Sequence, residues 1–256
     1  MPEIGGEPAD TNMDEIQKTA RFPRPARPRT ALAALLCALA LLPSPARAQH
    51  QPPKEEGKFR APDLVEVIKL DPPVRLDIRY ATADNFSGRA VYPEARAFLQ
   101  RPAALALVRA HRALHQQGYG LAVFDAYRPW HVTKLFWDIT PKDKRQFVAD
   151  PARGSRHNRG CAVDLTLYDL KTGRQVSMPS AYDDFTERAH VNYAGGTDEQ
   201  RRHRGILRAA LEAEGFAVFE PEWWHFDYKD WREYPILNIG FSEIGQPARR
   251  KPSRRR

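Results

Sequence analysis

The chain has 256 residues, with 40 Lys and Arg against 32 Asp and Glu and a formal net charge of +8. Six of these positive charges lie in 248–256, so the rest of the chain after residue 48 is close to neutral and shows no basic face interleaved with aromatics. This excludes a typical nucleic-acid-binding module. The length permits a substantial core, and Cys161 is the only cysteine after residue 48, so a chain processed there has no intramolecular disulfide.

Residues 1–48 have the organisation of a secretory signal peptide. Four arginines between positions 21 and 29 precede an uncharged apolar run, 31–42, and an Ala-x-Ala exit ends at Ala48. The run is too short to span a bilayer comfortably, although a buried helix is an alternative interpretation. We expect cleavage after Ala48, translation from Met1 or Met13, and a periplasmic or secreted protein with no membrane span.

The remainder divides into a linker, one folded domain and a tail. Residues 49–62 are rich in Gln, Pro and Lys and are typical of a linker. We expect the domain to cover 63–245. The tail, 246–256, is predicted to be disordered, with at most weak attraction to anionic surfaces.

Periodicity predicts an α+β fold for this domain. Alternating or continuous apolar runs predict strands over 64–70, 74–80, 121–127, 162–168, 216–219 and 222–228. Helical spacing and stop signals predict helices over 103–117, 131–138, 141–150 and 199–214. Without internal repeats or a second linker, the expected architecture is a single domain with a mostly antiparallel central sheet flanked by helices.

A histidine and an aspartate stand seven residues apart where a loop enters the strand at 162–168. Asp164 would point away from the apolar face of that strand, toward a polar site. His157 lies an odd number of residues from Asp164, so a straight strand would direct the two side chains apart. Gly160 is where the chain could turn and bring them together. The pair is half of a metal site at the sheet.

The segment 222–225, Glu-Trp-Trp-His, supplies the other half. Two imidazoles and one carboxylate, from His157, Asp164 and His225, suffice for a catalytic zinc ion, which keeps an open position for water. A nearby carboxylate can accept a proton from that water, and Glu222 is the candidate. Glu222 and His225 are three residues apart, so both reach one metal only if the strand bends, and Pro221 could permit a break.

Each of these residues also has a structural interpretation when taken alone. A single His, Asp or Glu beside aromatics is more often a satisfied structural group than a functional one. Asp125 and Arg128, at the end of the strand predicted over 121–127, could form a surface ion pair. Proline at 129 holds Arg128 in an extended conformation at the strand end. The combination of motifs favours function over these alternatives.

Four ordered motifs together resemble the D-alanyl-D-alanine dipeptidases, zinc peptidases related to the D,D-carboxypeptidases of vancomycin resistance. They are Tyr-Ala-Thr-Ala-Asp-Asn-Phe at 80–86, Asp-Ala-Tyr-Arg-Pro at 125–129, Ser-x-His-x-x-Gly-x-Ala-x-Asp at 155–164 and Glu-Trp-Trp-His at 222–225. The resemblance covers roughly 67–234. It implies one zinc ion on His157, Asp164 and His225, with Glu222 as general base and Arg128 as the group that stabilises the oxyanion.

The same resemblance implies a substrate-binding set. Tyr80 and Asp183 would hold the ammonium end of a dipeptide, and Ser155 would donate its hydroxyl to the substrate. The loop that carries Asp183 departs from the family pattern Met-Gly-x-x-Phe-Asp, because it has Pro179 in place of Gly and Tyr182 in place of Phe.

The expected function is zinc-dependent hydrolysis of D-alanyl-D-alanine and related D-dipeptides to free D-amino acids, in turnover or scavenging of wall peptides. One alternative is a peptidoglycan D,D- or L,D-carboxypeptidase or endopeptidase that acts on longer stem peptides. A more remote one is a non-catalytic, zinc-stabilised wall-binding module. The expected partner is a small dipeptide rather than a nucleic acid, and the sequence leaves the oligomeric state open.

Overall fold

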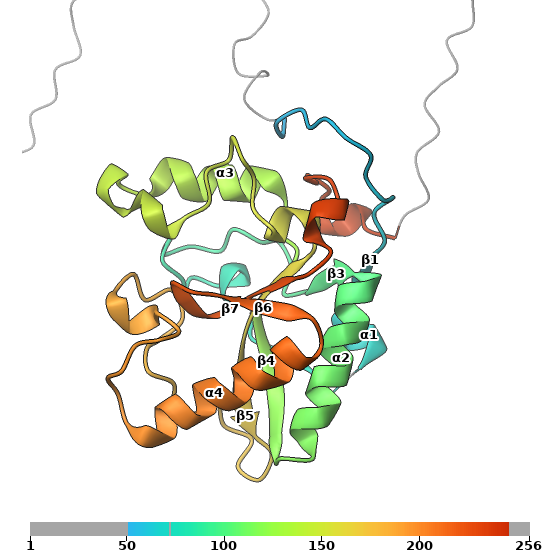
Figure 1. The fold of residues 1–256 in the computed structure, drawn as a ribbon. Coiled ribbons are helices and arrows are strands. Elements are labelled where there is room, and N and C mark those ends of the chain that lie inside the picture. The colour runs from blue at the N-terminus through green and yellow to red at the C-terminus, as the bar shows by residue number, and fades with distance from the viewer. Residues whose placement is uncertain (1–50, 72, 246–256) are drawn as a thin grey trace, which may run out of the picture. The chain divides into compact units, whose positions relative to one another are not determined.

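A five-stranded sheet lies at the centre of the computed structural model, which describes residues 51–71 and 73–245 (Figure 1). The strands are β2 (Arg75–Leu76), β4 (Tyr119–Asp125), β5 (Ala162–Asp169), β6 (Phe216–Phe219) and β7 (Glu222–Tyr228). Their order is β2-β4-β5-β7-β6; β2 runs parallel to β4 and the other pairs are antiparallel. A separate two-stranded antiparallel sheet joins β1 (Leu64–Glu66) to β3 (Phe98–Gln100).

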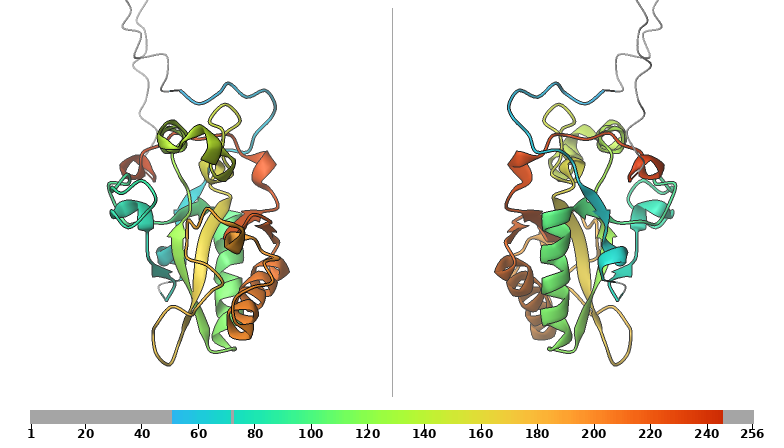
Figure 2. Two further views of the ribbon diagram at one scale, coloured as in Figure 1. Left: turned by 90° about the vertical axis from the view of Figure 1, so that its left-hand side faces the viewer. Right: turned by 90° about the vertical axis from the view of Figure 1, so that its right-hand side faces the viewer.

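Two long helices cover one side of the central strands. The α-helices of the described residues are α1 (Val67–Leu70), α2 (Arg101–His115), α3 (Trp130–Ile139) and α4 (Asp198–Ala213), and the two long ones meant here are α2 and α4. Helix α2 contacts β4, helix α4 contacts β6, and the two helices contact each other, as Figure 2 also shows. Helix α4 begins at a capping box in which Thr197 and Gln200 satisfy each other's backbone N–H groups. Because β4 and β5 are buried almost throughout, they form the rigid base from which the site projects.

The α+β class and the mostly antiparallel sheet are confirmed. Strands β4 to β7 and helices α2, α3 and α4 begin and end within two residues of the predicted positions. These are the segments in which a long apolar pattern, a glycine stop or a capping residue marks the element. The signals that specify the sheet are therefore local.

Three predicted elements are wrong in type or length, and β3 was not predicted. The segment 64–70 changes from strand to helix after Glu66, because its partner β3 is only three residues long and ends where α2 begins. In 74–80, Val74, Ile78 and Tyr80 are buried as the alternation predicts, but the chain pairs only over β2 and then turns. The segment 141–150 forms a 3₁₀ helix, Lys142–Phe147, instead of an α-helix.

The described part of the predicted linker contacts the folded domain. Within 51–62 there is no helix or strand, and Glu55 accepts hydrogen bonds from Arg159 Nη2 at 2.5 Å and from the backbone N–H of Ile236 at 2.6 Å. The predicted signal peptide, its cleavage site and the tail 246–256 lie outside the described residues. Among the residues that are described, no helix combines the length and apolar character needed to cross a membrane.

Two irregularities in strand pairing fall beside the motifs. The register of β4 on β5 shifts between Val123 and Asp125, which leaves Phe124 as an extra residue. On β6 and β7, Val218 pairs with Phe226 whereas Phe219 pairs with Glu222, so three residues of β7 bulge out between these two pairs. The bend that Glu222 and His225 require is therefore present, and it follows Glu222 rather than lying at Pro221. Bulges of this kind redirect side chains.

Gly160 makes the turn between His157 and Asp164 that the sequence predicts. Its φ of 67° lies in the left-handed region, and its N–H closes the 3₁₀ turn His157–Arg159 on the carbonyl of His157. A Cβ at this position would lie 2.5 Å from Leu64 Cδ2 and 3.3 Å from the backbone nitrogen of Gln100. Any side chain at position 160 would therefore combine backbone strain with a collision.

We expect Gly160→Ala to lower the free energy of unfolding by about 1–3 kcal/mol, because alanine resists this conformation and has no room there. Gly205→Ala is the matched control, since Gly205 is an exposed position of α4 with no atom within 4 Å of an added Cβ. It should raise stability by up to about 1 kcal/mol, because glycine weakens a helix interior. Urea unfolding of both metal-free variants measures these effects; equal stabilities for the two would refute the role of Gly160.

Candidate metal centre and active site

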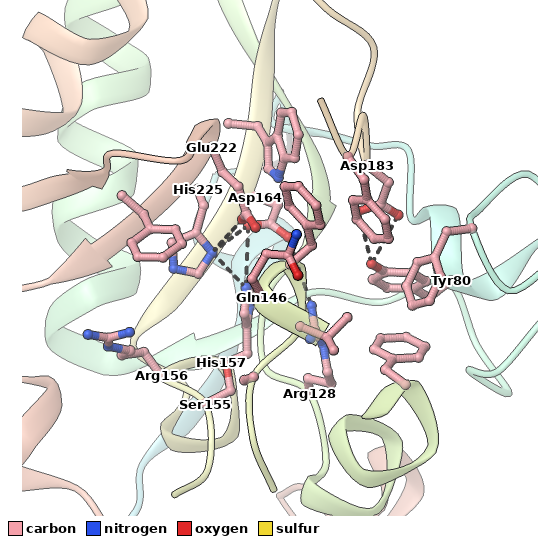
Figure 3. Close-up of a pocket in the computed structure, with 18 of the residues that line it drawn as sticks. Tyr80, Arg128, Gln146, Ser155, Arg156, His157, Asp164, Asp183, Glu222 and His225 are labelled. Carbon is pink, nitrogen blue, oxygen red and sulfur yellow. Dashed lines mark hydrogen bonds and ion pairs between the residues drawn. The ribbon is translucent and has the colours of Figure 1, made fainter. Parts of the chain in front are cut away.

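Three predicted metal ligands converge from three separate elements. His157 opens the 3₁₀ turn His157–Arg159, whereas Asp164 on β5 pairs directly with His225 on β7. Asp164 Oδ1 lies 3.3 Å from His157 Nε2 and 2.9 Å from His225 Nδ1, and the two nitrogens are 3.1 Å apart (Figure 3). All three side chains are buried. One atom from each residue is therefore available to a single ion.

The outer nitrogen of each imidazole has a partner that fixes the direction of the ring. His157 Nδ1 lies 2.6 Å from the carbonyl oxygen of Ala126, and His225 Nε2 lies 2.9 Å from Asp227 Oδ1. When these nitrogens donate, His157 Nε2 and His225 Nδ1 are left with lone pairs that face each other.

Asp164 Oδ1 adds a third lone pair to this point. It is a buried oxygen without a hydrogen-bond donor among the described residues. Burial opposes ionisation of Asp164, whereas positive charge on His157 and His225 lowers the pKa of this carboxyl well below its usual range, so a cation at this point keeps Asp164 ionised. Three converging acceptors need a cation, and two nitrogens with one carboxylate oxygen suit zinc. The donor set therefore fits the expected metal.

Asp227 is a functional neighbour that the sequence predictions missed. Its Oδ1 accepts a hydrogen bond from the outer nitrogen of His225, and its Oδ2 lies 3.4 Å from Arg156 Nε. Carboxylates in this position orient metal-ligating histidines and strengthen them as ligands. The available signal was the strand period, because residues 225 and 227 of one strand share a face.

Glu222 lies beside the three ligands without belonging to them. The bulge in β7 brings Glu222 Oε2 to 3.9 Å from His225 Nδ1. Burial raises the pKa of Glu222 to about 7, with the charge of Asp164 acting in the same direction and that of His225 in the opposite one. A carboxylate with its pKa near neutrality can both accept and return a proton at physiological pH.

Arg128 and Asp125 form a buried pair, which corrects their interpretation as a surface ion pair. Asp125 Oδ2 accepts hydrogen bonds from Arg128 Nε at 2.9 Å and from Nη2 at 2.8 Å, while Tyr92 donates to Asp125 Oδ1 at 2.7 Å. Arg128 Nη2 also lies 4.0 Å from Asp164 Oδ2. The bulge at Phe124 places Asp125 opposite Asp164, so a fixed positive charge stands beside the metal ligands.

Tyr80 and Asp183 meet at the other end of the site. The Tyr80 hydroxyl donates to the carboxylate of Asp183, with distances of 3.2 and 3.1 Å to its two oxygens. Burial, together with the charges of Asp164 and Glu222, raises the pKa of Asp183 well above its usual value. This carboxylate would be stabilised by a cationic group in the space beside it.

Ser155 has the structural role that loop serines often have. Its Oγ accepts a hydrogen bond from the backbone N–H of His157 at 3.2 Å and so stabilises the turn that presents this ligand. Ser155 nevertheless lines the cavity, and its hydroxyl proton is not used in this bond.

All eight predicted site residues line one cavity of about 150 Å³ (Figure 3). Its polar end holds the three metal ligands, Glu222 and Arg128, whereas Asp183 lies across from them beside Tyr80. The walls are largely aromatic and include Phe86, Phe136, Phe147, Phe185, Phe219 and Trp224. The cavity therefore offers a small polar molecule a metal site, a fixed cation and an anionic end.

Comparison with known proteins identifies relatives over this whole region. Residues 60–242 match the family Peptidase_M15, described as D-ala-D-ala dipeptidase. The chain is 34% identical to the D-alanyl-D-alanine dipeptidase of Escherichia coli over 73% of this chain and 95% of that protein. It is 36% identical to the D-alanyl-D-alanine dipeptidase of Enterococcus faecalis, over 66% and 92% respectively. A solved LdcB LD-carboxypeptidase aligns with a TM-score of 0.39 and 21% identity over 66% of this chain and 69% of that one, too distant to support an argument.

We expect His225→Ala to lose the metal, because it removes one of three ligands and leaves Asp164 Oδ1 and His157 Nε2 to hold it. His190→Ala is the matched control, since His190 is exposed and outside the cavity. Metal content after dialysis, measured by atomic emission, should be about one zinc ion per chain in the control and near zero in the ligand variant. Full occupancy in His225→Ala would contradict the assignment.

Proposed function

The chain belongs to the D-alanyl-D-alanine dipeptidase family and is a zinc metallopeptidase, and we propose that it hydrolyses D-alanyl-D-alanine and related D-dipeptides to free D-amino acids. The observation that carries this proposal is the shared cavity, in which the Asp183 carboxylate lies apart from the candidate metal site (Figure 3). A site with a charged group at a set distance from the metal favours a short substrate with a free ammonium group.

His157, Asp164 and His225 would hold the zinc ion, which would supply a Lewis acid and lower the pKa of a water molecule. Glu222 accepts a proton from the attacking water as the oxygen–carbon bond forms. It then returns this proton to the amide nitrogen, so that the carbon–nitrogen bond breaks and a free amine leaves. The pKa of Glu222, which burial raises to about 7, suits both transfers.

Arg128 stabilises the negative charge that develops on the carbonyl oxygen. Its Nε and Nη2 are held by Asp125, so the guanidinium stays in place without ordering at the moment of reaction. The rings of Tyr80 and Phe136 lie 5.3 and 4.9 Å from its central carbon and limit the access of water. A fixed charge in such a dry place stabilises an oxyanion more strongly than a mobile one in water.

Asp183 and Tyr80 bind the ammonium group of the substrate. Its arrival adds a positive charge beside Asp183, whose ionisation burial and the charges of Asp164 and Glu222 oppose and the charge of Arg128 favours. An acylated amine lacks this charge and would leave the carboxylate unpaired. A substrate with a blocked amino end is therefore rejected, which distinguishes a dipeptidase from an enzyme that trims longer stem peptides.

We also propose that the protein acts outside the cytoplasm, on dipeptide released from the cell wall. The supporting observation is the basic, apolar and Ala-x-Ala order of residues 1–48. An exported enzyme encounters wall-derived dipeptide rather than cytoplasmic precursor, which favours scavenging or turnover. The mass of the protein recovered from the periplasm tests this, because export with cleavage gives a chain that begins at Gln49.

We expect the zinc-loaded protein to release D-alanine from D-alanyl-D-alanine. The kcat/KM for N-acetyl-D-alanyl-D-alanine should be lower by at least about tenfold, because the charged hydrogen bond to Asp183 is lost. Asp183→Asn should remove most of this discrimination. The assay is release of free D-alanine, and a preference for the acylated peptide would instead favour a carboxypeptidase.

We expect Glu222→Gln to keep one zinc ion per chain while kcat falls at least about 100-fold, because the amide cannot accept the proton. In the wild type, kcat/KM should fall as the pH drops through the pKa of Glu222. This pKa is about 7 from burial, and the charge of a bound metal would lower it further. A pH–rate profile with an acidic limb at or below pH 7 is the measurement; near-full activity of Glu222→Gln would exclude this residue as the base.

A further inference from the structure

The hydroxyl of Tyr182 makes a contact that none of the proposed steps uses. It lies 2.9 Å from Asp164 Oδ2, the carboxylate oxygen that faces away from the two imidazoles. A phenol is protonated at neutral pH, so Tyr182 donates this hydrogen bond. The two oxygens of Asp164 therefore have different surroundings, since Oδ1 meets His157 and His225 whereas Oδ2 meets a hydroxyl.

The position of Tyr182 is fixed by packing. Its ring centroid lies 4.7 Å from that of Phe124, 5.5 Å from that of Trp224 and 6.1 Å from that of Tyr80. Both Phe124 and Trp224 are extra residues of the two strand bulges. A tyrosine enclosed on several sides has little rotational freedom, so its hydroxyl stays directed at one place.

The loop that carries Tyr182 is also tied to the strand that bears Glu222 and His225. Trp223 Nε1 donates to Ser180 Oγ at 2.9 Å, two residues before Tyr182. The next residue, Asp183, has a φ of 58°, the only positive φ of a non-glycine residue in the described chain. This turn lets two consecutive residues face the same site, because both contact Tyr80.

We propose that Tyr182 is a positioning residue for the metal: its hydroxyl holds Asp164 Oδ2, so that Asp164 binds the ion through Oδ1 alone. The carboxylate then occupies one coordination position and leaves the remaining one open. Without the hydroxyl, Oδ2 has only Arg128 Nη2, at 4.0 Å, as a polar neighbour among the described contacts, and the carboxylate is free to rotate toward the ion. Ligating carboxylates at other metal centres are likewise hydrogen-bonded by outer partners, whose loss weakens metal binding.

The proposal has a consequence for the substrate end of the cavity. Tyr182 and Asp183 are consecutive, so one short loop sets both the ligand geometry at Asp164 and the position of the group proposed to bind ammonium. The positioning role of Tyr182 rests on the proposed metal site but not on the identity of the substrate. Metal affinity is measured without any substrate, so its failure is distinguishable from failure of the dipeptidase proposal.

The test compares Tyr182→Phe with Tyr80→Phe, because each variant removes one hydroxyl from neighbouring tyrosine rings. Zinc affinity is measured by competition with a chromophoric chelator, and the metal environment by the visible absorption of the Co²⁺-loaded proteins. Tyr182→Phe should bind zinc about 10- to 100-fold more weakly, and its cobalt bands should weaken as a second carboxylate oxygen joins the ion. Tyr80→Phe should keep the wild-type affinity and spectrum but raise KM for a dipeptide with a free ammonium group.

A zinc affinity of Tyr182→Phe within twofold of wild type, with an unchanged cobalt spectrum, would show that Tyr182 only packs. X-ray absorption at the zinc edge of the wild-type holoenzyme measures how many carboxylate oxygens bind the ion. It needs no variant, so the test does not depend on folding of the substituted chain. We expect a single carboxylate oxygen at about 2.0 Å. Two oxygens of Asp164 bound at similar distances would overturn the proposal.

Discussion

The structure depends on three buried lone pairs that are directed at one point. His157, Asp164 and His225 would repel one another in a dry interior, and the arrangement is stable only with a positive charge between them. Each ring is held by a further acceptor, the carbonyl of Ala126 or the carboxylate of Asp227, so neither histidine can easily turn away. The fold thus holds these lone pairs in an electrostatically unfavourable arrangement that a divalent ion would stabilise.

Breaks in regular secondary structure create this convergence. A straight β7 would direct Glu222 and His225 to opposite faces, and an unbroken β4 would shift the register of Asp125 away from Asp164. The left-handed turn at Gly160 likewise directs His157 toward Asp164. The regular parts of the sheet hold the base rigid, whereas its irregular positions choose which side chains meet.

The sequence predicts the central sheet and the identity of the site residues well. It predicts poorly the short elements and the neighbouring side chains that hold these residues in place. Long apolar runs such as 121–127 and residue types with metal-binding chemistry are local signals, and the structure brings all eight predicted residues to one cavity. The short strand β3 and the turn after Leu76 depend on distant partners, which no local pattern specifies. For the same reason Asp125 resembled a surface residue, because its burial comes from Tyr92 and from the packing around Arg128. Tyr182 departs from a family pattern, but its hydrogen bond to Asp164 joins two separate segments and is not specified by any local pattern.

The contacts of Glu55 have a consequence for the order in which the domain is completed during synthesis. Glu55 is made early, yet its carboxylate meets Arg159, 104 positions later, and the backbone of Ile236, 181 positions later. Arg159 ends the turn that begins with the ligand His157. Glu55 can therefore form both contacts only when almost the whole domain has been synthesised, and one of the two is to the turn that presents His157. In a nascent chain, Glu55 lacks its second partner until the segment after β7 has been synthesised.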